Sequence, residues 1–142
     1  SIGEFGTAVF NCSELGITPI FGSGDLAFTK EAKALVKGIE TVAVKRGLTP
    51  GQGSECDTDQ YRNRNLAAVH THPEKAREMI RKGAYDALTR YLKDPASFHI
   101  PKLDPPYVLE QITRKNGDTP AKQNKWEHPS SIIGVFNRPY GQ

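Results

Sequence analysis

The stretch ITPIFGSGDLAFTKEAKALVKGIETVAVK, residues 17–45, decides the fold class of this 142-residue chain. Its short apolar run at 18–21 is followed by glycine and is typical of a buried strand. A turn is expected at 22–25, and Thr29 can cap a helix that ends at the next glycine. The β-branched run at 39–45 predicts a second strand. Strand, helix and strand in this order predict a parallel pair joined by a crossover helix, and therefore an α/β sheet.

The residues on either side extend this pattern. A helical stripe with spacings of three and four precedes the first strand, and Gly16 offers its C-terminal stop. Downstream, Pro73 suits the first position of a long helix, because the N–H that proline lacks would have no partner there. Asp94-Pro95 ends that helix. The stripe of the first helix consists of Ile2, Phe5, Val9 and Cys12.

The remaining segments predict a smaller C-terminal part. Residues 46–69 are polar and rich in glycine, which predicts a long loop. The alternation at 107–114 predicts a strand, residues 118–130 are polar with few apolar side chains, and 131–136 suit a last strand or a docking segment. We therefore expect an α/β fold, with a mainly parallel sheet, crossover helices and a smaller β-containing C-terminal part.

Composition and charge exclude several classes of protein. The net charge is +3, divided as −2 over residues 1–40 (three Lys, five acids) and +5 over the rest. Without a dense basic stripe, this bias argues against nucleic-acid binding. No apolar run approaches the roughly 20 residues that a membrane span needs. Cys12 and Cys56 form no CxxC pair, which argues against a cysteine zinc site. Nothing demands an oxidising compartment, so we expect a cytoplasmic protein.

Two motifs admit both a chemical and a structural interpretation. In His70-Thr71-His72, histidines at i and i+2 can ligate one metal, but capping of the next helix by Thr71 or His72 is the favoured interpretation. Gly22-Ser23-Gly24-Asp25 lies between a strand and a helix, as a phosphate-binding loop would. It lacks the spacing and the lysine of the known phosphate motifs, and Asp25 would repel phosphate. A tight turn with a capping aspartate is favoured there.

Two residues at the N-terminus are further candidates. Ser1 can act as an N-terminal nucleophile with its own α-amine as general base, although a fragment boundary also leaves a serine there. Glu4 lies at the start of the first helix between glycines that allow close approach of backbone or ligand. It is either a metal ligand or an acid that matches the helix dipole, and spacing alone favours the dipole.

Four motifs together resemble one known family. They resemble the C-terminal half of the M55 metallopeptidases, the DppA-like zinc D-aminopeptidases, whose members are about twice as long. The resemblance is good over residues 2–93 and fades after about residue 115. The residues at 47–66 and the C-terminal tail depart from the family pattern. The four motifs are Gly3-Glu4-Phe5-Gly6, Gly24-Asp25, Glu40 to Lys45 and His72 to Ile80.

The resemblance implies a pair of zinc ions, with Glu4 as one metal ligand. The other ligands and the catalytic histidine of the family lie upstream of these motifs, and the histidine equivalent to His72 is structural. We place Asp25 near the substrate pocket without a chemical role. Residues 1–46 are then the C-terminal part of a metal-binding α/β domain, and 47–142 comprise the loop, the long helix and the C-terminal α/β portion.

The resulting hypothesis is a C-terminal portion or subunit of a dizinc aminopeptidase or amidase. It would hydrolyse peptide or amide bonds with metal-activated water. An N-terminal half or partner chain would complete the site, and the assembly would be a homo-oligomer. Two alternatives stay open: an autoprocessed amidase subunit with Ser1 as nucleophile, and a non-enzymatic binding subunit.

Overall fold

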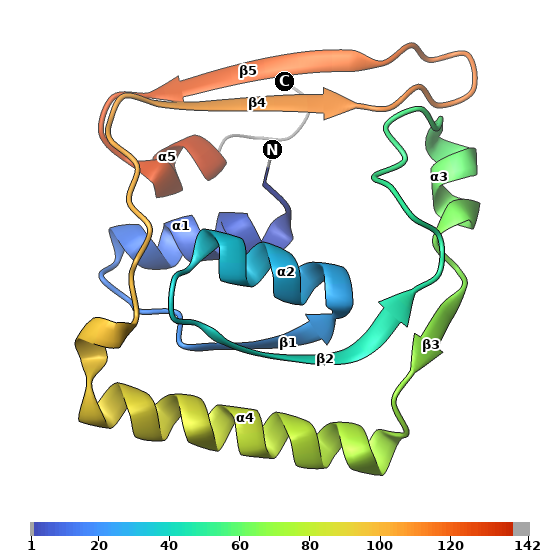
Figure 1. Cartoon of the computed structure of the whole chain (residues 1–142). Coiled ribbons are helices and arrows are strands. Elements are labelled where there is room, and N and C mark those ends of the chain that lie inside the picture. Colours follow the sequence, from blue (N-terminus) through green and yellow to red (C-terminus); the bar gives the residue numbers. More distant parts are fainter. Residues whose placement is uncertain (1, 138–142) are drawn as a thin grey trace. The chain divides into compact units, whose positions relative to one another are not determined.

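The computed structural model describes residues 2–137, which divide into two compact units (Figure 1). Unit 1 combines Ser1–Gly47 with Val69–Lys102, and unit 2 combines Leu48–Ala68 with Leu103–Gln142. Each unit is therefore discontinuous in sequence. The long helix predicted after Pro73 belongs by packing to the same unit as the N-terminal elements.

Unit 1 contains a three-stranded sheet, in the order β1-β2-β3, with helices on both faces (Figure 1). Helices α1 and α2 lie on one face of β1 and β2, and α4 lies on the other. The elements are α1 (Glu4–Glu14), β1 (Phe21–Asp25), α2 (Leu26–Leu35), β2 (Glu40–Gly47), β3 (Ala68–His70), α4 (Pro73–Lys93) and the 3-10 helix η1 (Pro95–Ser97).

The predicted α/β fold class is confirmed. Strands β1 and β2 pair in parallel, and α2 is the crossover helix between them. Strand β3 runs the other way, because Leu48 N–H donates to Ala67 O (3.0 Å) while Thr71 N–H donates to Val44 O (2.9 Å). Residue numbers thus fall along one strand as they rise along the other, as in an antiparallel ribbon. The sheet is mixed, with its parallel pair at the N-terminal side.

The position of β1 differs from the prediction. The glycine-rich segment expected to be a turn is the strand itself, paired from Phe21 opposite Glu40 onward, and the apolar run before it is not a strand. Its glycines form a flat surface for the Phe28 ring of α2: a Cβ added at Gly22 or Gly24 would lie 2.8 Å from that ring. Close packing, rather than turn geometry, therefore accounts for the glycines.

Helix α2 begins earlier than expected. Asp25 is its N-cap and its carboxylate accepts the Phe28 N–H at 2.7 Å, so the predicted capping aspartate is confirmed. Thr29 is not a cap, and that expectation was wrong. Thr29 lies one turn inside the helix, is buried, and donates its hydroxyl to Leu26 O at 2.9 Å.

The core of unit 1 lies between α1, α2 and the start of β2. Four buried residues form it, and Phe5 packs edge-on against Phe28 with ring centroids 5.1 Å apart. Because the aromatic pair joins the first turns of both helices, it fixes the start of α1 relative to α2. The four core residues are Val9, Ala32, Val36 and Ile39.

Helix α4 packs closely on the other face of the sheet. A Cβ added at Gly83 would lie 2.7 Å from Val42 Cγ2 and 2.9 Å from the Phe21 ring, so glycine permits the close approach. Near the C-terminal end of the helix, Arg90 donates to Gly38 O and forms an ion pair with Glu40 at 3.5 Å. No helix among residues 2–137, α4 included, is both long and apolar enough to cross a bilayer.

Unit 2 contains an antiparallel pair and two short helices. Strand β4 pairs with β5 from Tyr107 opposite His128 to Thr113 opposite Lys122. One of the two alternatives expected for 131–136, a last strand, was wrong. The polar segment 118–130 contains a strand, and 131–136 is helical, with Ser131 accepting the Gly134 N–H at 2.8 Å. The elements are α3 (Thr58–Arg64), β4 (Tyr107–Thr113), β5 (Lys122–His128) and α5 (Ile132–Phe136).

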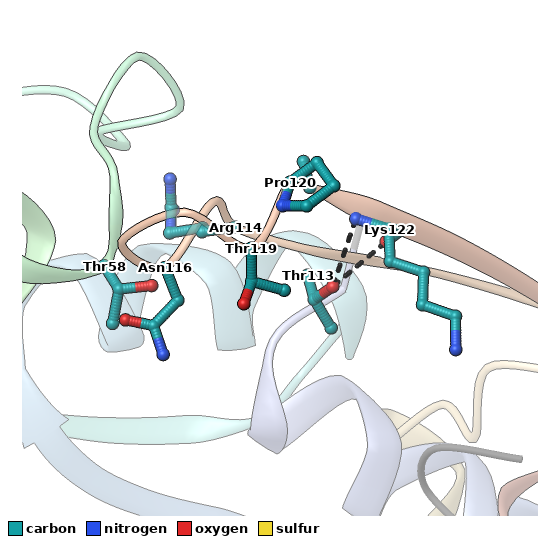
Figure 2. Close-up of a pocket in the computed structure, with 8 residues that line it drawn as sticks. Thr58, Thr113, Arg114, Asn116, Thr119, Pro120 and Lys122 are labelled. Atoms are coloured by element: carbon teal, nitrogen blue, oxygen red, sulfur yellow. Dashed lines mark hydrogen bonds between the residues drawn. The ribbon is translucent and has the colours of Figure 1, made fainter.

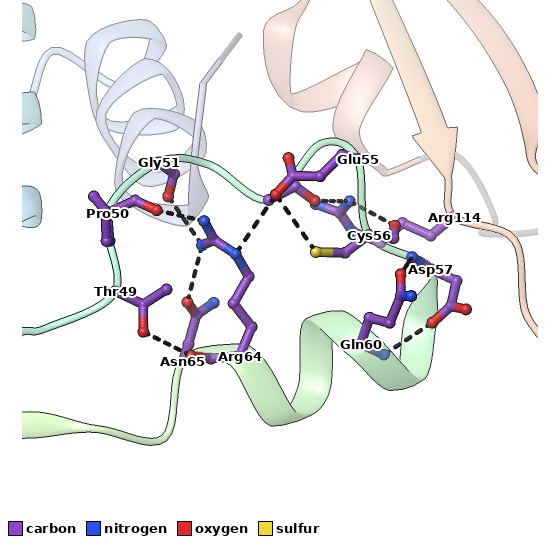
Figure 3. Close-up of polar contacts among 11 residues, drawn as sticks. Thr49, Pro50, Gly51, Glu55, Cys56, Asp57, Gln60, Arg64, Asn65 and Arg114 are labelled. Atoms are coloured by element: carbon purple, nitrogen blue, oxygen red, sulfur yellow. Dashed lines mark hydrogen bonds and ion pairs between the residues drawn. The ribbon is translucent and has the colours of Figure 1, made fainter.

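The expected long loop at 46–69 contains regular structure. Asp57 and Gln60 form a reciprocal capping box at the start of α3. Two arginines donate hydrogen bonds to backbone carbonyls of the residues before α3 (Figure 3). Arg64 donates to the carbonyls of Pro50 and Gly51, and Arg114 donates to the carbonyls of Gly53 (2.6 Å) and Cys56 (3.3 Å). The segment is thus held by charged donors rather than by an apolar core.

Candidate metal and substrate site

The candidate residues of unit 1 gather at one edge of its sheet. Helices α1, α2 and α4 begin at the end of the unit where β1 and β2 finish (Figure 1). Glu4 is the first residue of α1, Asp25 the last of β1, and His72 the N-cap of α4. Ligands of open α/β sheets bind outside the carboxyl ends of the strands. We therefore look for a ligand-binding site at this edge.

Glu4 borders an open cleft of about 370 Å³ between the first turns of α1 and α2. Its side chain is exposed and has no hydrogen-bond or ion-pair partner among residues 2–137. Glu31 lines the same cleft and accepts the Gly3 N–H at 3.1 Å. A Cβ on Gly3 would lie only 3.1 Å from that carboxylate, so glycine allows this contact. Glu31 thereby ties the first turn of α1 to α2.

This cleft fits part of a zinc site. The Glu4 carboxylate is a suitable oxygen ligand, unpaired and open to solvent. However, residues 2–137 contain no group of three or more His, Cys, Asp or Glu side chains that could hold a metal. A zinc ion needs three or four protein ligands. Glu4 can thus serve as one ligand, and the remaining donors must come from elsewhere.

The histidines before α4 do not cap it through their side chains. His72 occupies the N-cap position, but no side-chain capping hydrogen bond is present, so the expected imidazole or Thr71 cap was wrong. Pro73 at the first helical position removes one N–H that would need a partner. The His72 Nδ1 lies 4.0 Å from the Glu74 carboxylate, and both side chains are exposed.

The roles of the two other candidates from the sequence, Asp25 and Ser1, stay predictions. Asp25 uses one carboxylate oxygen for the α2 cap and does not line the cleft at Glu4, so its place near a substrate pocket stays a prediction. Ser1 lies outside the described residues, and its role as a nucleophile also stays a prediction.

A larger hollow of about 650 Å³ lies in unit 2, at the loop end of β4 and β5 (Figure 2). Three of the polar side chains that line it are already engaged in hydrogen bonds. Thr58 donates to Lys115 O at 2.8 Å, and the Thr113 hydroxyl bonds to the backbone of Lys122. Arg114, also in its lining, holds the carbonyls of the segment before α3. These contacts join α3 and the segment before it to the β4–β5 hairpin.

Comparison with known proteins assigns the family. The family model of the M55 peptidases, described as D-aminopeptidase, matches residues 1–122 of the 142. No curated protein and no solved structure matched the chain. The matched region includes the Glu4 cleft and the whole of unit 1, and it covers well over half of the sequence. The chain belongs to the M55 family of D-aminopeptidase-type peptidases.

Proposed function

We propose that this chain forms the C-terminal portion or subunit of a dizinc M55 aminopeptidase or amidase, with Glu4 as a zinc ligand. The observation that carries the proposal is the Glu4 carboxylate, which lies unpaired in a cleft at the carboxyl edge of the sheet. A carboxylate used only to match the helix dipole needs no cleft. The M55 membership supplies the reaction class, hydrolysis of a peptide or amide bond.

Four residues that line the cleft have a role in the proposed site. Glu4 would hold one zinc ion, and Glu31 would act as a positioning residue through its bond to Gly3 N–H. Phe5 and Phe28, packed edge-on, form one apolar wall of the cleft. When bound, a zinc pair supplies Lewis-acid polarisation of the scissile carbonyl and a water nucleophile that is active near neutral pH.

The remaining zinc ligands would come from an N-terminal half or a partner chain. Two features of unit 1 support a partner at this place. Strand β1 is at the edge of the sheet, and its outer side has no strand beside it among the described residues. Two apolar side chains between α1 and β1 are also exposed, Leu15 at 63% and Ile17 at 53%. A strand of a partner could pair with the open edge of β1.

Replacing Glu4 tests the proposal. Glu4→Ala should lower the zinc content of the purified assembly and reduce hydrolysis of D-aminoacyl peptides by more than about 100-fold, since loss of even an outer partner of a metal ligand costs roughly 10- to 100-fold. The midpoint of thermal unfolding in the presence of a chelator should fall only slightly, because Glu4 has no described partner and only its favourable position in the helix dipole is lost.

Glu74→Ala is the matched control. Glu74 is the first-turn acid of α4, as Glu4 is of α1, so it reports the helix-dipole effect without the cleft. We expect the Glu74 variant to keep its zinc and its activity. If the Glu4 variant also kept full zinc and full activity, the proposed ligand role would be wrong.

A further inference from the structure

Strand β5 of unit 2 has one open edge. Strand β4 pairs with its other edge, and these two strands form a sheet by themselves. Among the helices and strands of residues 2–137, β5 contacts only β4 and α5. Helix α5 contacts both strands, so it packs on a face of the sheet and not along the outer edge of β5. The backbone groups of that edge therefore have no strand partner among the described residues.

A two-stranded sheet is stabilised by further strands. An isolated antiparallel pair is marginally stable in water, whereas three or more strands with a packed face are stable. The β4–β5 sheet has no third strand among the described residues. The match to the M55 family ends at residue 122, where β5 begins, so membership of the family assigns no role to the rest of this strand.

The centre of β5, Lys125-Trp126-Glu127, is complementary to itself in antiparallel pairing. When two copies pair with Trp126 opposite Trp126, Lys125 of each copy lies directly opposite Glu127 of the other. Directly opposite side chains lie on the same face of a sheet, and aromatic pairs and opposite charges are favourable there. A register displaced by two residues places Lys125 opposite Lys125 or Glu127 opposite Glu127. Charge therefore selects a single register.

The two charged side chains are available to a second copy. Lys125 and Glu127 are exposed, with 53% and 62% of their side-chain surface open to solvent, and they form an ion pair at 2.9 Å within one chain. Both lie on the outer face of the sheet, because Trp126 between them is partly buried on the other face. Across the paired strands, the two lysines and two glutamates would alternate in sign. A lysine at a sheet edge discourages pairing unless an acid lies opposite it.

The outer edge of β4 is less suited to pairing with a second copy. Antiparallel pairing about the centre of that strand would place Glu110 opposite Glu110, and like charges in that position are destabilising. The residues before β4, Pro105 and Pro106, also lack the N–H groups that would extend the pairing. Strand β5 is therefore the edge whose sequence favours a second copy.

We propose that two copies of this chain associate through β5, with the strands antiparallel and Trp126 at the twofold axis. The two hairpins then form one four-stranded sheet, in the order β4-β5-β5-β4. This inference is independent of the proposed zinc site, because all of its residues belong to unit 2. A single strand pair is a small interface, and small interfaces are typical of transient complexes, so we expect a dimer that dissociates on dilution.

Charge reversal tests the pairing, with the chain as it purifies and with its N-terminal half where the two co-purify. Lys125→Glu places two carboxylates opposite each other at both contacts, and Glu127→Lys places two ammonium groups there. We expect each variant alone to dimerise about tenfold more weakly than the parent, because like charges directly opposite are destabilising. Sedimentation equilibrium over a range of concentrations measures the dissociation constant. Lys122→Glu is the control of equal charge: Lys122 would lie opposite Ser130, so its dissociation constant should stay close to that of the parent.

Mixing the two variants separates pairing between copies from the ion pair within one copy. Both variants lack the internal Lys125–Glu127 ion pair, but a mixed dimer again places opposite charges at both contacts. We therefore expect the equimolar mixture to dimerise about as strongly as the parent, and thermal unfolding of each variant to stay cooperative. A mixture that associates no better than its components, or a parent chain that stays monomeric at high concentration, would overturn the proposal. So would a dimer that neither charge reversal weakens.

Discussion

At the residue scale, the type of amino acid did not show which side chains already make hydrogen bonds within the protein and which do not. Asp25 and Glu4 are both acids at helix starts, but Asp25 accepts the Phe28 N–H while Glu4 has no partner among the described residues. The same contrast separates two histidines. The His128 Nδ1 accepts the Ser131 N–H at 2.8 Å, whereas His72 makes no side-chain cap. Asp25 and His128 thus have a structural role, because their side chains accept backbone hydrogen bonds.

His72→Asn should leave the zinc content of the assembly unchanged and slightly raise its stability. The His72 backbone is extended enough for a cap (φ −51°, ψ 136°), and no side-chain bond is lost with the imidazole. Asparagine is among the best N-cap residues, so we expect a gain of about 0.5–1 kcal/mol. Thermal unfolding and metal analysis measure both quantities. His72→Ala should match the parent protein, and loss of stoichiometric zinc in either variant would show that His72 is a ligand.

At the scale of the elements, glycine positions determine how closely helices approach the sheet. Phe28 of α2 covers Gly22 and Gly24 of β1 on one face, and Gly83 of α4 meets Phe21 and Val42 on the other. Helices α2 and α4 thus pack closely on opposite faces of the sheet whose edge carries the candidate site. A small shift of α2 would move Glu31 relative to Glu4 across the cleft.

Gly83→Ala tests the contact between α4 and the sheet. The added methyl would lie 2.7 Å from Val42 Cγ2, so a side chain or the helix must shift. We expect a net loss of about 1–3 kcal/mol from overpacking, even though alanine has the higher helix propensity by about 1 kcal/mol. Denaturant unfolding measures it. Gly47→Ala, with no atom within 4 Å, is the control and should be nearly neutral. A stabilised Gly83 variant would contradict the close packing.

At the scale of the whole molecule, the proposed metal site is incomplete among the described residues, which contain no group of three possible metal ligands. The α1 stripe is well covered at Val9 (1% exposed), but Ile2 at 44% and Leu15 at 63% are not. Ile39, just before β2, is buried, and Val42 and Val44 of β2 are only partly so. The segments at both ends of α1 therefore present apolar surface that a partner could cover.

Expression of residues 1–142 alone tests the need for this partner. Apolar surface contributes roughly 25 cal/mol per Å². A few hundred Å² left uncovered forfeits several kcal/mol of a typical net stability of about 5–15 kcal/mol. We expect an aggregated or weakly folded product without zinc uptake, and rescue by co-expression with the N-terminal half. Size-exclusion chromatography and thermal unfolding are the measurements. A monodisperse, cooperatively unfolding monomer would favour a non-enzymatic binding subunit.

The sequence by itself determined the elements whose signals are local. Helix α4 begins at Pro73 and ends before Asp94-Pro95 as predicted, and β2 follows its β-branched run. The parallel pair with its crossover helix followed from the order of elements. The family came from the motifs that resemble M55, and the proposed metal role of Glu4 rests on the same motifs and not on spacing. These features depend on neighbours in the chain, which a sequence displays directly.

Only the tertiary structure decided the features that depend on contacts between distant residues. The glycines of β1 predicted a turn from local sequence. Their actual role is to pack against the Phe28 ring, which comes from the next helix. Polar β5 has no apolar alternation, and its place is set by pairing with β4. Such pairings join positions far apart in the chain, and local propensity carries no information about them.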